Sequence, residues 1–354
     1  MSLASFSDAA ELRIYLGCEK TPASPAGIFL SALNTETGAL QPPKRVATAD
    51  NPSFIAIKDD HLYSVSEGKT GAVVSWSVGS DGSLTRLNEQ STGGEGPCHV
   101  SISPSGRVLF AANYSSGSLA AFPLEKDGSI GARSAFIQLT GSGPNPKRQT
   151  SPHAHGIYCD PAEKFVYVTD LGTDRVWIYR LNADDATLIP LEPGTLPPGS
   201  GPRHLAFAGN RIYVNGEMGL GVTLLQRDAD TGTLQTGPTT AAFPSGMEVP
   251  SNADTAEVVV HPNGKFLYLS TRGYSSFSSF AIAPDGLLTL LQNIPSPVQG
   301  PRHFSLSPDG RWLIAAGQRD HRAAVCSIDP ATGKIQPPEH AIEVPGPVCA
   351  IFAP

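Results

Sequence analysis

The sequence predicts an all-β protein, a seven-bladed β-propeller with four antiparallel strands in each blade. Two observations lead to this fold class. Glycine (36) and proline (32) are abundant among the 354 residues while charged residues make up only 16%, a composition typical of many short strands joined by tight turns. In addition, a pattern of strands and turns recurs along the whole chain at intervals of roughly 45 to 55 residues, within the range of propeller repeats.

Each repeat begins with a small or apolar residue beside a proline or at a strand start, followed by a short alternating strand. A turn such as "SPSG" or "SPDG", a second apolar strand and two further strands complete the unit. Four strands in a repeat of this length are the pattern of a propeller blade. The repeats start at "NPSFIAI" (51), "GPCHVSI" (96), "SPHAHGI" (151), "GPRHLAF" (201), "TAEVVVHPNG" (255), "GPRHFSL" (300) and "GPVCAIFAP" (346).

The two ends of the chain complement one another. The last repeat stops after one strand, whereas the first begins with "ELRIYLGCEK", which matches a second strand. We therefore expect residues 346–354 to supply the inner strand and residues 12–49 the outer three strands of a split blade. This closes the ring with strands from both termini and leaves no open sheet edge. Length alone would favour two domains, but the repeat predicts a single domain over residues 1–354.

Bulk properties exclude several classes of function. A net charge of −7 with no lysine or arginine run argues against nucleic-acid binding. Five scattered cysteines without a CxxC pair support neither a disulfide framework nor a zinc ribbon, and they fit a reducing compartment. No segment approaches the roughly 18 apolar residues of a membrane span. We expect a cytoplasmic protein without a membrane partner.

Polar and ionisable residues gather at one rim of the predicted ring. The start of each inner strand and the end of the next strand share this rim, because the two run antiparallel. The turns of the opposite rim are explained by turn formation, so we place the functional site at the polar mouth of the channel. The rim residues are Glu67, Cys98, His99, Asn113, His153, His155, Asp170, Arg203, His204, Asn215, Glu217, Glu257, Arg272, Arg302, His303, Gln318 and Arg319.

The arginines of this rim indicate an anionic ligand. Arg203, Arg272 and Arg302 come from three different repeats, and guanidinium groups grip carboxylates or phosphates through paired hydrogen bonds. The alternative is that each arginine pairs with a local carboxylate. Glu217 ends an apolar strand near them, where burial would raise its pKa and cations would lower it. It could therefore serve as a general base or as a salt-bridge partner.

Two further features point to the same rim. A long insertion over residues 140–153 carries Lys147 and Arg148, and loops of this length often serve a site. His153 and His155 are two apart on a strand, so both rings are expected to face one side. They could act in acid–base chemistry or substrate binding, pack in the core, or bind metal. A zinc site needs a third ligand, and no second cluster has suitable spacing. We expect neither metal nor cofactor.

Five segments together resemble the seven-bladed propeller lactonase family, which includes propeller-type 6-phosphogluconolactonases and 3-carboxy-cis,cis-muconate cyclases. They are "NPKRQTSPHAHGI", "VTDLGTDRVWIYRL", "YVNGE", "LYLSTRG" and "GPRHFSLSPDGRWLIAA". They occur in order and in separate repeats, and the likeness covers essentially the whole chain. Tyr274 in "RGYSS" stands where the family commonly has a histidine, a difference that bears on the particular substrate more than on the fold. The resemblance implies a catalytic group of His153 or His155, Arg203, Glu217 and Arg272.

The leading hypothesis is hydrolysis of a sugar-acid lactone, with 6-phosphogluconolactone as the first choice of substrate, in carbohydrate metabolism. Glu217 or one histidine would activate water, and Arg203 or Arg272 would stabilise the oxyanion. A carboxymuconate cyclase-type enzyme and a non-catalytic binding platform are the alternatives. The residues expected to bind the small anionic substrate are Lys147, Arg148, His204, Arg302, His303 and Gln318.

Overall fold

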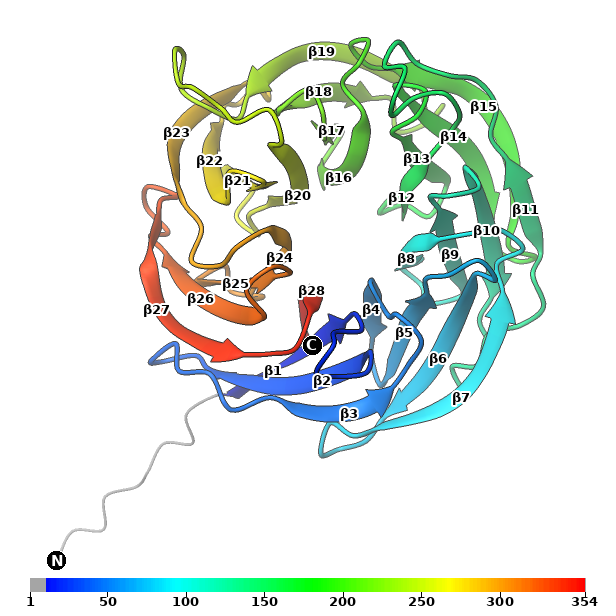
Figure 1. The fold of residues 1–354 in the computed structure, drawn as a ribbon. Coiled ribbons are helices and arrows are strands. Elements are labelled where there is room, and N and C mark those ends of the chain that lie inside the picture. The colour runs from blue at the N-terminus through cyan, green and yellow to red at the C-terminus, as the bar shows by residue number, and fades with distance from the viewer. Residues whose placement is uncertain (1–10, 354) are drawn as a thin grey trace, which may run out of the picture.

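In the computed structural model, which describes residues 11–353, 28 strands form seven four-stranded antiparallel sheets arranged as the blades of a ring (Figure 1). The predicted all-β fold class and the number of blades are confirmed. Within the described residues there is no helix that could cross a membrane.

The split blade forms as predicted, because the last strand of the chain pairs with the first (Figure 1). From the inside outward its strands are β28 (Pro347–Phe352), β1 (Glu11–Cys18), β2 (Gly27–Asn34) and β3 (Lys44–Thr48). The following two blades contain β4 (Ile55–Lys58), β5 (His61–Ser66), β6 (Ala72–Val78) and β7 (Leu84–Ser91), and then β8 (Pro97–Ile102), β9 (Val108–Asn113), β10 (Ser118–Pro123) and β11 (Ala135–Gln138).

The other four blades repeat this arrangement around the ring. The first two contain β12 (Ala154–Cys159), β13 (Phe165–Asp170), β14 (Arg175–Asn182) and β15 (Thr187–Thr195), then β16 (Pro202–Ala208), β17 (Arg211–Gly216), β18 (Gly221–Arg227) and β19 (Leu234–Ala241). The last two contain β20 (Asp254–Val260), β21 (Phe266–Arg272), β22 (Ser276–Ile282) and β23 (Leu288–Pro295), then β24 (Pro301–Leu306), β25 (Trp312–Gly317), β26 (Arg322–Ile328) and β27 (Ile335–Glu343).

Burial within a blade follows the sequence pattern of each strand. The second strands β9, β13 and β25 are buried at every position, which explains their nearly continuous apolar sequences. The outermost strand β7 instead has only exposed and half-buried residues. The core therefore lies between neighbouring blades, and it fixes the ends of the inner two strands where the polar rim begins.

Neighbouring blades are also joined by a hydrogen bond that recurs around the ring. A buried tyrosine on the second strand donates its hydroxyl to a glycine carbonyl in the next blade, at 2.8–3.0 Å. Each accepting glycine has a positive φ of 77–94°, a backbone conformation that disfavours other residues. The pairs are Tyr15 with Gly82, Tyr63 with Gly128, Tyr167 with Gly232, and Tyr213 with Gly286.

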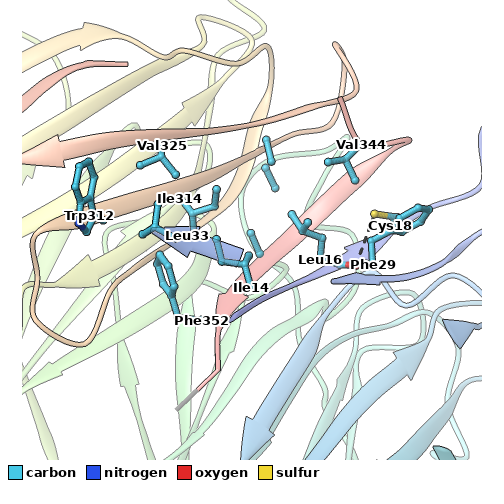
Figure 2. Close-up of a cluster of buried hydrophobic side chains, with 13 residues drawn as sticks. Ile14, Leu16, Cys18, Phe29, Leu33, Trp312, Ile314, Val325, Val344 and Phe352 are labelled. Carbon is cyan, nitrogen blue, oxygen red and sulfur yellow. Dashed lines mark hydrogen bonds between the residues drawn. The ribbon is translucent and has the colours of Figure 1, made fainter. Parts of the chain in front are cut away.

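Apolar packing seals the junction between the split blade and its neighbour. Ile14 and Leu16 of β1 and Phe352 of β28 lie in one buried cluster with Trp312 and Ile314 of β25 (Figure 2). Residues from the two ends of the chain thus share one core with the preceding blade. The ring is free of exposed strand edges only if this junction is closed. The cluster therefore stabilises the closed propeller.

We expect Ile14→Ala to lower the free energy of unfolding by about 2–5 kcal/mol, since it leaves a cavity in the sealing cluster. Ile189→Ala provides a matched control, because Ile189 is 55% exposed on an outer strand and should change stability by less than about 0.5 kcal/mol. Denaturant titration measures both. Equal effects of the two substitutions would contradict the importance of the junction.

Candidate active site

A cavity of about 220 Å³ opens at the polar rim, in the position predicted from the strand ends. Its walls come from six blades and one loop, so no single segment of sequence contains the site. The lining residues are Glu67, Cys98, Tyr114, Arg148, His155, Glu217, Arg272 and Arg302.

β-Bulges at the starts of the inner strands position several of these side chains. The register between β12 and β13 shifts between Ala154 and Gly156, which leaves His155 as the extra residue. A similar shift places Cys98 outside regular pairing in β8, and another does so for Arg302 in β24. A bulge re-aims a side chain away from its regular direction. The three bulge residues, one on each of three inner strands, all line the cavity.

Glu217 is the centre of the charged part of the site. Its side chain is 4% exposed, and its carboxylate accepts hydrogen bonds from Arg148 Nη2 at 2.6 Å and Arg203 Nε at 3.0 Å. Arg272 Nη2 lies 2.9 Å from the same carboxylate. Burial by itself would raise the pKa of Glu217, but the attraction of Arg272, Arg203 and Arg148 lowers it to about 2. The carboxylate is therefore ionised at neutral pH.

The arginines retain hydrogen-bonding capacity beyond Glu217. Arg203 is almost fully buried behind Glu217 and also donates to the carbonyl of Ala256. The Nε of Arg272 is buried without a hydrogen-bond partner among the described residues. Arg302 is half-buried in the cavity wall and makes no hydrogen bond or ion pair with any other residue in the range 11–353. Buried polar groups normally have partners, so the unpaired Nε of Arg272 is unusual, while the half-buried guanidinium of Arg302 in the cavity wall is available to an anionic ligand.

His153 and His155 occupy different environments although they are two residues apart. His153 precedes β12, donates from Nδ1 to the Tyr114 carbonyl at 2.9 Å, and stacks on the Tyr114 ring. His155 lies in the bulge and lines the cavity. The bulge interrupts the regular alternation that predicts a shared face for the two rings.

Cys98 lies beside His155, with 3.8 Å between Sγ and Nδ1. The pair nevertheless lacks the charge state of a nucleophilic dyad. Burial raises the pKa of the Cys98 thiol to about 12, and burial together with Arg203 lowers the pKa of His155 well below its usual value. A thiolate is the reactive form of cysteine, so a neutral thiol beside a neutral imidazole does not support covalent catalysis.

Three buried polar residues form a layer beneath the cavity. His204 Nδ1 lies 2.8 Å from Glu257 and His303 Nε2 lies 3.4 Å from it. The ring of His204 is 5.2 Å from that of His155 on the cavity side. Glu257 and His303 also line a larger cavity, of about 590 Å³, formed by the inner strands on the other side of this layer. The predicted substrate-binding residues His204 and His303 therefore lie outside the 220 Å³ cavity.

The other residues predicted to form the site also fall into two groups, those that line the 220 Å³ cavity and those that do not. Arg148, His155, Glu217, Arg272 and Arg302 are brought together in the cavity wall. Lys147 is exposed on the loop, and Gln318 donates to Glu19 at 3.2 Å, so neither lines it.

Sequence reasoning did not select Tyr114, whose hydroxyl accepts a hydrogen bond from Arg148 at 3.3 Å. The only feature of the sequence that points to Tyr114 is its position one residue after Asn113, at the end of a second strand. Within residues 11–353, no cluster of three or more His, Cys, Asp or Glu side chains is arranged to hold a metal ion.

Comparison with known proteins agrees with this architecture. The family model described as "Lactonase, 7-bladed beta-propeller" matches residues 13–352. The 6-phosphogluconolactonase of Bacillus subtilis is 30% identical over 94% of this chain and 96% of its own length, and that of Pectobacterium atrosepticum is 34% identical over 81% and 82%. The solved structure of the periplasmic gluconolactonase PpgL from Pseudomonas aeruginosa superposes with a TM-score of 0.90 at 27% identity, covering 98% and 99% of the two chains.

The depressed pKa of Glu217 predicts a pH dependence of stability. A carboxyl group with a pKa near 2 in the folded state and 4.5 as its ordinary value contributes about 3 kcal/mol above pH 4.5, and this is lost as the pH falls toward 2. The stability difference between wild type and Glu217→Gln should therefore shrink below pH 4.5. Denaturant titrations at several pH values measure it, with exposed Glu192→Gln as control. A difference that stays constant with pH would contradict the ion cluster.

Proposed function

Because the chain belongs to the seven-bladed β-propeller lactonase family, we propose that it hydrolyses a sugar-acid lactone, with 6-phosphogluconolactone as substrate and 6-phosphogluconate as product. The observation that carries this proposal is the cavity lined by three arginines at one mouth of the ring. Two relatives named 6-phosphogluconolactonase, each at least 30% identical, support the choice of lactone.

The charge of the cavity supports a phosphorylated substrate. Arg148, Arg272 and Arg302 line it against the carboxylates of Glu67 and Glu217, and Arg203 adds a fourth guanidinium behind Glu217. The excess of positive charge attracts an anion, and the low dielectric constant of a partly buried site strengthens that attraction. Arg302 lines the cavity and has no ion pair with a carboxylate of residues 11–353. We assign it to the phosphate, since a guanidinium can bind phosphate oxygens in a bidentate manner.

The arginines around Glu217 suit the chemistry of ester opening. Attack on the lactone carbonyl moves negative charge onto its oxygen, and cationic donors held in place beforehand stabilise that charge. Glu217 keeps Arg203 and Arg272 in position, through a hydrogen bond from Arg203 and an ion pair with Arg272. We assign the oxyanion to Arg272, because its guanidinium lines the cavity and is held in place by Glu217. His155, a neutral imidazole in the cavity wall, contacts the substrate.

Arg272→Ala should lower kcat/KM at least 100-fold on both 6-phosphogluconolactone and unphosphorylated gluconolactone, since loss of one oxyanion donor costs about 10²–10³ in rate. Rates are measured on freshly generated lactone and corrected for spontaneous opening. Exposed Arg319 on the same rim gives the matched control, Arg319→Ala. Activity retained in the Arg272 variant would contradict its role. Turnover of carboxymuconate alone would move the function to a cyclase-type enzyme.

Arg302→Ala separates phosphate binding from chemistry. Loss of one charge-assisted contact costs about 1.5–3 kcal/mol, so we expect KM for 6-phosphogluconolactone to rise about 10- to 100-fold. The rate on gluconolactone, which has no phosphate, should change less than about threefold. Steady-state kinetics on the two lactones measure this split. An equal loss on both substrates would contradict the assignment of Arg302 to the phosphate.

A further inference from the structure

The cavity contains a second carboxylate that the ion cluster does not use. Glu67 follows β5 in the first complete blade, remote in sequence from Glu217, and is partly exposed at the cavity wall. No arginine, lysine or histidine lies within ion-pair distance of it among residues 11–353. A carboxylate repels an anionic substrate, so its presence in an anion-binding cavity calls for a role other than binding.

Local hydrogen bonds hold Glu67 in one orientation. The hydroxyl of Ser53 donates to its Oε2. Its backbone N–H donates to the Asn51 carbonyl at 3.2 Å, and the Asn51 side chain donates to its carbonyl oxygen at 3.3 Å. Oε1 accepts no hydrogen bond within the described part of the chain. The residue thus has one anchored and one free carboxylate oxygen, which is the arrangement required to accept a proton from a bound water.

The other ionisable groups of the cavity are poor proton acceptors. The carboxylate of Glu217 is engaged by three guanidinium groups, which lower its pKa to about 2. Burial keeps His155 neutral and lowers its pKa well below the usual value, while the Cys98 thiol stays protonated. A weakly basic group removes a proton from water inefficiently. Glu67 is the remaining candidate.

We propose that Glu67 is the general base that activates the hydrolytic water, an inference that rests on the proposed lactonase function. Glu67 takes one proton from water as the water oxygen bonds to the lactone carbonyl carbon, and the carbonyl electrons move onto the oxygen facing Arg272. When the tetrahedral intermediate collapses, the bond from carbonyl carbon to ring oxygen breaks. Glu67 returns its proton to the ring oxygen, which becomes the hydroxyl group of the product. One water is consumed, and Glu67 ends as it began.

The test is Glu67→Gln, which keeps size and polarity but removes the basic site. We expect kcat on 6-phosphogluconolactone to fall at least 100-fold with KM changed less than about threefold, because general base catalysis contributes about 10²–10⁴ in rate. Glu67→Asp should retain more activity than Glu67→Gln. Formate added to Glu67→Ala should restore part of kcat, since a small carboxylate can occupy the vacated space. The matched control is Glu95→Gln, an exposed carboxylate in the loop before β8, which should match wild type.

The outcomes separate this inference from the proposed function. Wild-type protein that opens neither lactone above the spontaneous rate overturns the proposed function and the role of Glu67 with it. Active wild type with a Glu67→Gln kcat within threefold overturns the general base alone. A raised KM at unchanged kcat also overturns it, because that result assigns Glu67 to binding. Circular dichroism and the melting temperature confirm that each variant is folded, and formate rescue gives a readout that a structural defect would not produce.

Discussion

The structure of the site depends on one buried carboxylate, Glu217, surrounded by guanidinium groups. Transferring these charges out of water is costly, and only mutual attraction with good hydrogen-bond geometry offsets it. Glu217 achieves this by joining Arg203 of its own blade, Arg272 of the next blade and Arg148 of the long loop. One side chain therefore fixes the relative position of three segments that are up to 124 residues apart in the sequence, from Arg148 to Arg272.

This cluster requires a rigid frame, because charges held at 2.6–3.0 Å lose their advantage if the blades shift. The frame consists of the apolar cores between blades, the tyrosine-to-glycine hydrogen bonds, and the junction that joins β28 to β1. The geometry of the polar rim is set by the positions of the strand ends, because the central residues of these strands are packed in the cores between blades. Closure of the ring, far from Glu217 in sequence, is thus a condition for the arrangement of the arginines.

Strand order, blade number and the split blade could be predicted from the sequence because apolar alternation and turn residues recur in every repeat. The polar rim followed from topology alone, since strand direction decides which ends meet. Finer placement could not be predicted. The bulge at His155 breaks the alternation that groups it with His153, and His303 is drawn to buried Glu257 rather than to the cavity. Such details depend on contacts between blades, which a single sequence does not reveal.

The two carboxylates of the cavity illustrate how environment separates the roles of identical chemical groups. The cationic neighbours of Glu217 lower its pKa, and Glu217 in turn holds Arg148 and Arg272 in the wall of the cavity where we place the oxyanion. Glu67 accepts a hydrogen bond from the Ser53 hydroxyl on one carboxylate oxygen, and its other oxygen has no hydrogen-bond partner among residues 11–353. A site that must bind an anion, stabilise developing negative charge and accept a proton needs these functions on different groups. The two carboxylates lie on separate blades, so that Glu217 pairs with the guanidinium groups while Glu67, among residues 11–353, stays outside ion-pair distance of them.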